Sequence, residues 1–182
     1  MHKRIRLPLP VSLAACLLVL LASPRYCRAE NFFILSAEGG IGGGIEPVAG
    51  VMQFHLGWGG HDSMTSVAED PTFVIFGASA ASLTRFSVGT DVALLGRMSF
   101  GLFPVGGWGG AIEVGPYLRV NDPHSVGALG EIIVGVPWGL QLSLWGEYGT
   151  FENRAIGATA GFDFARFAHY AIGRIVAGAT GR

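Results

Sequence analysis

Long stretches of this chain alternate apolar residues with small or charged ones, and this period of two is the feature that most restricts its fold. In the clearest stretch, 108–120, Val114 and the residues two positions away on either side share one face, whereas Glu113 and Arg119 share the other. The stretch 91–102 repeats the pattern. Because successive side chains of a strand point to opposite faces, each stretch forms one apolar and one polar wall. The sequence therefore predicts an all-β fold whose strands separate two different environments.

Turn residues divide the chain into eight candidate strands. They are 32–42, 49–58, 72–87, 90–102, 108–120, 126–136, 139–149 and 155–167. Most connections are two to six residues long and rich in glycine, proline, asparagine or aspartate, which predicts antiparallel hairpins. The segment Tyr170–Ala177 is a ninth candidate, and because single-chain bacterial barrels have even strand numbers, either the first or the last candidate is not expected to be a barrel strand. The longer connection 59–71 is the candidate functional loop.

The first 29 residues have the composition of a secretory signal peptide, and we expect them to be cleaved off. A basic start precedes the apolar run Val11–Ala22, and Cys27–Ala29 precedes the expected cleavage point. The apolar run is shorter than the roughly 20 residues that a membrane-spanning helix needs. Leu13–Cys16 also resembles a bacterial lipobox, but the apolar run continues past Cys16, which disfavours lipidation.

The remaining residues, 30–182, are expected to form a single domain with few charges. They include seven arginines, no lysine and 13 acidic residues, which give a net charge of −6, and they contain no cysteine. This composition excludes disulfides, thiol catalysis and cysteine-based zinc sites in the mature chain. The acidic balance also disfavours nucleic acid as a partner.

The placement of the charges predicts which face of the strands meets water. A water-facing surface carries about 25–35% charged residues, whereas 30–182 has only 20 charged residues among 153. The charges recur singly, in mid-strand, on the face that also carries small residues: Glu38, Asp91, Arg97, Glu113, Arg119, Glu131, Glu147 and Asp163. We expect these side chains to form a polar network in the lumen, with Arg97, Arg119 and Arg85 bridging the carboxylates, because buried charges must be paired. The predicted fold is an antiparallel up-and-down transmembrane β-barrel of about eight strands, preceded by a cleaved signal peptide.

Two other architectures share some of these properties. A soluble secreted barrel has the same period with the opposite orientation and would bind an apolar ligand. If the charges were instead unconnected surface charges of a soluble sheet, the apolar face of that sheet would need a cover, and no amphipathic helix is evident in the sequence to supply one. An α-helical membrane protein is disfavoured, because the best window, 125–145, contains Glu131 and Pro137 and keeps a strand-type alternation. Aromatic residues near the strand ends suit the interfacial belts of a membrane barrel, although Trp145 falls in mid-strand on the polar face.

The signal peptide, the glycine-rich alternating strands, the Glu/Arg pattern and the cysteine-free mature chain together resemble the small bacterial outer-membrane β-barrel proteins, the OmpA transmembrane-domain and OmpX-like group. The resemblance covers nearly all of 30–182 and lies in the pattern, without a diagnostic motif. It implies an outer-membrane location and contact with outer-membrane lipid and lipopolysaccharide. In that family the closing strand ends in an aromatic residue at the C-terminus, whereas here Ala158–Phe167 resembles such a strand placed 15 residues before the end. This difference leaves the strand count and the closing strand open.

Candidate catalytic and metal-binding residues are few. A barrel-type hydrolase acting on lipid A could draw on His61, Asp62 and Ser63, or on His124 and Ser125 near Glu131. Adjacent strand residues point to opposite faces, so neither cluster assembles a catalytic relay by itself. The histidines of the mature chain are too scattered to predict a metal site: His55, His61, His124 and His169. The glycine-rich run 39–44 is followed by Pro47 and no helix, which disfavours a phosphate-binding loop.

The sequence thus predicts an integral outer-membrane barrel with a structural or surface-interaction role, without a cofactor, a metal or assigned catalytic residues. An open pore is not expected, because eight strands enclose a lumen just wide enough for side chains to fill. The alternatives are a lipid A-modifying hydrolase on the same fold and the soluble barrel that binds an apolar ligand. No protein partner can be named from the sequence.

Overall fold

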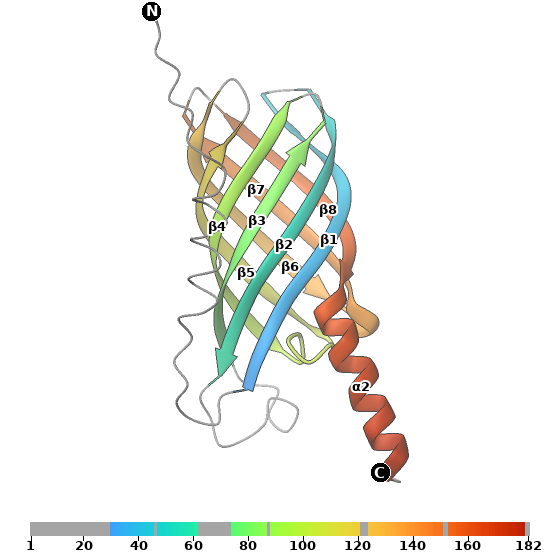
Figure 1. Cartoon of the computed structure of the whole chain (residues 1–182). Helices are drawn as coiled ribbons and strands as arrows, with labels where there is room; N and C mark the ends of the chain where they lie inside the picture. Colours follow the sequence, from blue (N-terminus) through green and yellow to red (C-terminus); the bar gives the residue numbers. More distant parts are fainter. Residues whose placement is uncertain are drawn as a thin grey trace, which may run out of the picture.

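The protein folds into a closed, antiparallel β-barrel of eight strands in a computed structural model that describes residues 30–45, 47–61, 74–86, 88–120, 124–150 and 153–180 (Figure 1). The elements in chain order are β1 (Glu30–Gly44), β2 (Ala49–His61), β3 (Val74–Arg85), β4 (Gly89–Gly101), β5 (Gly109–Arg119), β6 (Val126–Gly135), the 3-10 turn η1 (Pro137–Gly139), β7 (Leu140–Gly149), β8 (Arg154–Asp163) and the helix α2 (Phe164–Thr180). Each strand pairs with its sequence neighbour, and β8 pairs with β1. The expected signal peptide, 1–29, lies outside the described residues.

The two ends of the barrel differ. One end, called the hairpin end, carries the connections 45–48, 86–88, 120–125 and 150–153. The other, called the helix end, carries the end of β2 and the start of β3, the connection 102–108 and η1, together with the start of β1 and the helix α2 (Figure 1). All strands run between these two ends, so the topology is an up-and-down barrel.

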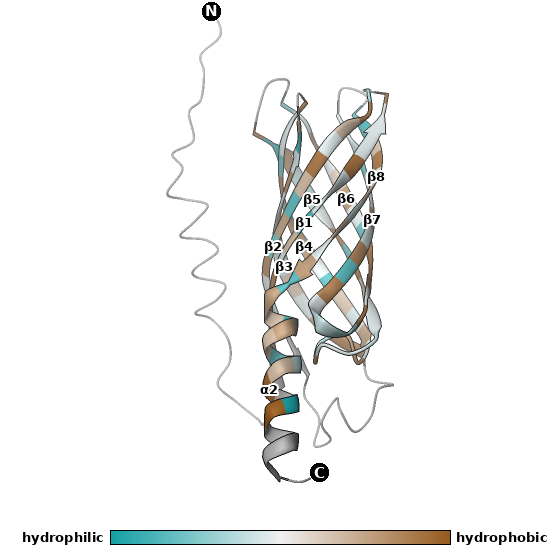
Figure 2. Ribbon diagram, turned by 90° about the vertical axis from the view of Figure 1, so that its right-hand side faces the viewer, coloured by the Kyte–Doolittle hydropathy of each residue, from teal (hydrophilic) through white to brown (hydrophobic). Residues whose placement is uncertain are grey.

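Successive side chains of every strand point alternately into the lumen and outward. In β4, Asp91, Ala93, Leu95 and Arg97 are buried, whereas Val92 and its outward neighbours are exposed. The other strands alternate in the same way, and the outward residues are predominantly apolar. Figure 2 shows hydrophobic and hydrophilic residues interspersed along the strands. The period of two read from the sequence is therefore the alternation between the lumen and the outer wall.

The ninth candidate strand was wrong, since Tyr170–Ala177 belongs to α2. The eight other candidates all correspond to strands, and the last of them, expected to run to Phe167, ends as β8 at Asp163. The expectation that no amphipathic helix is available was also wrong. The chain turns helical at Asp163, whose carboxylate accepts a hydrogen bond from the backbone N–H of Arg166 (3.0 Å) and caps the first turn. Apolar residues then recur at the spacing of a helix. In so short a segment, this spacing was not distinguished from the alternation of a strand.

Arg166 fixes the first turn of α2 across the helix end of the barrel. Its buried guanidinium donates hydrogen bonds to the carbonyl oxygens of Phe103 (2.7 Å), Gly107 (3.1 Å) and Val136 (3.1 Å). It also lies 3.9 Å from the centre of the Phe103 ring. Burial lowers the pKa of Arg166 to about 10, so the side chain remains charged at neutral pH. One side chain of α2 thereby ties two connections of the helix end together.

The helix α2 has a barrel side and an outer side. On the barrel side, the ring of Tyr170 packs against that of Trp138 at a tilt of 54°, with ring centroids 4.8 Å apart, and His169 lies against Phe32. The outer side is apolar and exposed: Phe164, Phe167, Ile172 and Ile175. Among the described residues, no helix has the length and apolar character needed to cross a membrane.

The anchoring role of Arg166 can be tested by truncation. Arg166→Ala removes a cation that donates to backbone carbonyl groups, and we expect the free energy of unfolding to fall by at least about 3 kcal/mol, because hydrogen bonds to charged groups contribute roughly 1.5–3 kcal/mol each. Arg174→Ala, in the exposed part of the same helix, should change it by less than about 0.5 kcal/mol. Urea titration followed by tryptophan fluorescence measures both, and equal effects would contradict an anchor at Arg166.

Candidate functional site in the barrel interior

The lumen is built in layers that alternate between polar and apolar. Along β4 from the hairpin end, the buried residues are first the acidic Asp91, then the apolar Ala93 and Leu95, and then the basic Arg97. The neighbouring strands add to the polar levels, because Asp91 pairs with Arg119 and Arg97 with Glu113 of β5, and Glu113 pairs in turn with Glu131 of β6. Two polar networks result, separated by an apolar layer.

The first network, called the hairpin-end network, consists of two arginines and two carboxylates with polar neighbours. Arg119 binds Asp91 through two bonds, from Nε to Oδ1 (2.8 Å) and from Nη2 to Oδ2 (3.1 Å). Glu147 Oε1 lies 2.6 Å from Arg85 Nη2 and 3.2 Å from Arg119 Nη2. Asn153 connects this network to the hydroxyl of Tyr117. Its two positive and two negative charges balance, so the network is neutral as a whole.

The apolar layer below it fills the cross-section of the lumen. Its buried members are Val51, Ala81, Leu83, Ala93, Leu95, Tyr117, Leu129, Trp145 and Ala155. The Trp145 indole fits only because positions 42 and 157 are glycines. A Cβ at Gly42 or Gly157 would overlap its ring. The sequence placed Trp145 on the polar face, and it is indeed buried, at 3% exposure. The packed layer closes the barrel to an open aqueous pore.

The second network, called the central network, is centred on Glu113, which is completely buried. Arg97 Nη1 lies 3.0 Å from Glu113 Oε1, and Ser79 donates to the same oxygen at 2.9 Å. The other oxygen, Oε2, lies 3.1 Å from His55 Nδ1. The opposite ring nitrogen, His55 Nε2, lies 3.5 Å from Glu131 Oε2. His55 therefore sits between two carboxylates in the middle of the barrel.

Two carboxylates of the central network are held by neutral groups. Glu38 accepts hydrogen bonds from Gln141 Nε2 (2.6 Å) and Thr159 Oγ1 (2.7 Å). Glu131 accepts one from Gln53 Nε2 (2.6 Å). Arginines were expected to bridge the lumen carboxylates, whereas Glu38 and Glu131 are held by amides and a hydroxyl. These neutral partners lie on other strands, so their identity depended on a register that the sequence pattern left unspecified.

All eight residues expected in the lumen are buried, and they fall into three places. Asp91, Arg119 and Glu147 belong to the hairpin-end network, and Glu38, Arg97, Glu113 and Glu131 to the central network. Asp163 lies at the helix end, where it caps α2. Sequence reasoning missed Gln53, Gln141 and Thr159 as partners of the carboxylates, although Gln141 lies on the same alternating face as Glu147 of β7, Thr159 on that of Asp163 of β8, and Gln53 on that of His55 of β2.

The candidate hydrolase residues do not come together as a relay in the part of the chain that the structure describes. Ser125 contacts the Tyr117 hydroxyl (3.1 Å) and donates to the carbonyl of Thr150, and His124 Nδ1 lies near the carbonyl oxygen of Arg119. No serine–histidine pair forms between them in these described contacts. Asp62 and Ser63 lie outside the described residues, and nothing is described of the side chain of His61.

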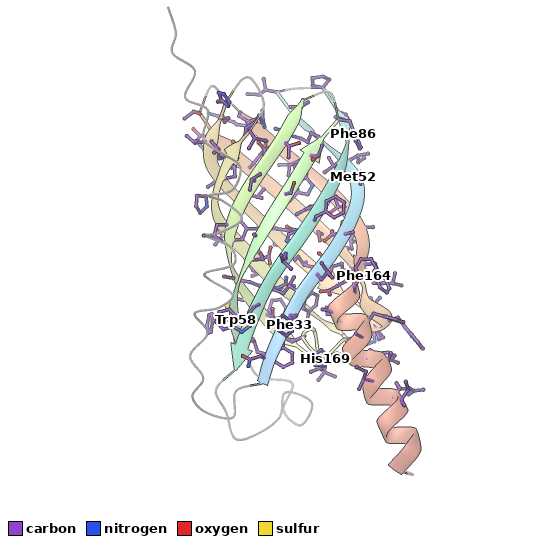
Figure 3. All side chains as sticks on the ribbon, in the orientation of Figure 1. Phe33, Met52, Trp58, Phe86, Phe164 and His169 are labelled. Carbon is purple, nitrogen blue, oxygen red and sulfur yellow. The ribbon has the colours of Figure 1, made fainter. Side chains whose placement is uncertain are left out.

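The outer wall contrasts sharply with the lumen. Among strand residues whose side chains are described, the exposed large hydrophobic ones lie on every strand, and Arg154, at the start of β8, is the one exposed ion. Figure 3 shows Met52 and Phe86 toward the hairpin end and Phe33 and Trp58 toward the helix end. The outer wall therefore has almost no charged groups that water would hydrate.

Comparisons of this chain with family models, with curated proteins and with solved structures found no match in any of the three.

The hairpin-end network generates a test of buried charge pairing. Arg119→Ala leaves Asp91 and Glu147 buried with less positive charge, and we expect the free energy of unfolding to fall by about 3–5 kcal/mol. The matched control is Arg154→Ala, because Arg154 is exposed, lies 4.8 Å from the centre of the Tyr148 ring and donates a long hydrogen bond (3.4 Å) to the hydroxyl of the same residue; its loss should cost about 1 kcal/mol or less. The midpoint of urea unfolding gives both values, and similar losses would argue against the charged interior.

Proposed function

We propose that the protein is an integral outer-membrane β-barrel with a structural or surface-interaction role, exported by residues 1–29 acting as a signal peptide. The observation that carries the proposal is the distribution of charge over the barrel wall. Exposed apolar residues lie on all eight strands, whereas nine-tenths buried charged side chains fill the inside. Transfer of an apolar wall from water to lipid is favourable over its whole area. In a soluble barrel that binds an apolar ligand, the two faces would be reversed.

A closed sheet is also the form of β-structure that lipid tolerates. β1 and β8 bond to each other from Ser36–Asp163 to Gly44–Ala155, so the barrel is closed along this span. Over this span neither strand leaves a row of unpaired backbone groups to face hydrocarbon. The closure supports a role in a bilayer rather than at its surface.

Aromatic side chains near both ends support two interfacial belts. Phe86 and Tyr148 are exposed at the hairpin end, and Trp108 and Trp138 at the helix end. The first turn of α2 adds the exposed Phe164 and Phe167 beside the helix end, and the rest of the helix extends away from the barrel (Figure 1). Lipid and lipopolysaccharide are thus the partners that the surface favours.

A packed lumen supports a structural or surface-interaction role over transport. Leu83, Leu95 and Leu129, at 0–1% exposure, and Trp145 lie between the two polar networks. Ions or solutes would have to displace this layer to pass. The contacts of Ser125 and His124 likewise give no support to lipid hydrolysis.

Fractionation tests the proposed location directly. We expect the expressed full-length chain to appear in the outer-membrane fraction, to lose its first 29 residues, to be extracted only by detergent, and to migrate differently on a gel before and after boiling. Folded, water-soluble protein without detergent would contradict the proposal. Cleavage and membrane location are read separately, from the N-terminal sequence and from the fraction.

The orientation of the wall is tested by placing a charge on it. Leu144 lies in the middle of β7 and is 58% exposed on the outer wall. Leu144→Arg should destabilise the barrel in liposomes by about 2–4 kcal/mol, whereas Val126→Arg, at the hairpin end of β6, should cost roughly 0–1 kcal/mol. Folding titrations into liposomes measure both changes. Equal tolerance of the two arginines would show that the middle of the wall is not in hydrocarbon.

A further inference from the structure

Three side chains from distant parts of the sequence converge in the centre of the barrel. Glu38 on β1, His55 on β2 and Glu131 on β6 each offer one ligand atom, and these atoms lie within 4.8 Å of one another. All three residues are at most 4% exposed. We propose that they form a binding site for one divalent transition-metal ion of the zinc class.

Unpartnered polar atoms point to a ligand at this place. Nε2 of His55 and Oε1 of Glu131 are buried without a partner at hydrogen-bonding geometry among the described residues. Buried polar atoms without partners cost free energy, and native interiors contain few of them. A cation between His55 and Glu131 would satisfy the nitrogen and the oxygen together.

The groups around the three ligands are those that orient metal ligands. His55 Nδ1 lies 3.1 Å from Glu113 Oε2, so the other ring nitrogen, Nε2, is left for the metal. Glu113 is itself held by Arg97 and Ser79. This is the carboxylate–histidine–metal arrangement that fixes the tautomer of a ligand histidine. Each carboxylate ligand is also positioned by an amide, Glu38 by Gln141 and Glu131 by Gln53.

Charge in the central network favours a divalent cation. The network contains three carboxylates, those of Glu38, Glu113 and Glu131, and one arginine, Arg97. With a neutral His55 and all three carboxylates ionised, its formal charge would be −2, in contrast to the neutral hairpin-end network. An ion of charge +2 balances this excess in a lumen where an unpaired charge is costly. One imidazole with two carboxylates matches zinc and similar metals better than calcium or magnesium, which prefer oxygen ligands alone.

Binding requires only a local contraction. Zinc lies about 2.0–2.2 Å from histidine nitrogen and carboxylate oxygen, so the three side chains must each move inward by rotation. Glutamate has flexible torsions that allow this, and each oxygen of Glu38 keeps a second lone pair beside its present hydrogen bond. The metal would link β1, β2 and β6 across the lumen.

Zinc binding by the full chain in detergent tests the site. The protein is folded in EDTA, loaded with zinc chloride, desalted and measured for zinc per chain and for its thermal midpoint. We expect one zinc per chain and a higher midpoint than in EDTA. Zinc that washes out, or a midpoint that zinc does not change, would overturn the proposal.

Variants locate the zinc in the lumen. Glu131→Gln should weaken zinc binding at least tenfold by removing a ligand, and Glu113→Gln about 10–100-fold by removing the partner of His55. Glu147→Gln is the control, because its buried carboxylate belongs to the hairpin-end network, and it should bind zinc like the unchanged chain. Equal affinities for all variants would place the zinc elsewhere and refute the site.

X-ray absorption spectroscopy of the zinc-loaded, unsubstituted chain tests the site without relying on the folding of a variant. We expect a zinc shell with one imidazole nitrogen and the other ligands oxygen. Two or more imidazoles would assign the zinc to other histidines, such as His124 and His169, and would overturn the proposal. The measurement does not depend on membrane insertion, so its failure is separate from a failure of the proposed function.

Discussion

Pairing between β1 and β8 is the interaction on which the rest of the structure depends. The register Glu38–Gly161 and its neighbours turn a meander of hairpins into a closed cylinder. Without it, both edge strands would expose unpaired backbone groups, and no lumen would exist. Closure also brings Thr159 of β8 to the carboxylate of Glu38, two groups separated by 121 positions in the chain. The polar networks are therefore consequences of a backbone pairing.

The narrow lumen explains the unusual use of small residues. Large interior groups such as Trp145 and Arg166 fit because glycines lie opposite them: a Cβ at Gly42 or Gly157 would meet the indole, and one at Gly135 would meet the guanidinium of Arg166 and the ring of Phe103. Glycine normally weakens strands through lost packing and backbone entropy. In this barrel its effect is offset, since the space it leaves is filled by a large side chain from a neighbouring strand or from α2.

Alternating polar and apolar layers give the interior both rigidity and specificity. The hairpin-end network satisfies its charges internally through Arg85 and Arg119, while the helix end is closed by Arg166 and the Asp163 cap. Between them, the apolar layer excludes water, which strengthens the electrostatic interactions on either side. The central network is the exception, because its carboxylates outnumber its fixed positive charge. This imbalance distinguishes it from the purely structural polar groups nearby.

The alternation of residues by itself determined the β class, the two faces of each strand and the burial of charges such as Arg97 and Glu113, because a period of two is a local property of the backbone. Local composition did not predict the structure of the C-terminal end. There β8 ends at Asp163, which also caps a helix whose first turn is fixed by Arg166. The partners inside the lumen were decided only by the tertiary structure. Gln53, Gln141 and His55 reach the glutamates of other strands through the register of eight pairings, and a shift of one residue in any of them would turn those side chains to the opposite face.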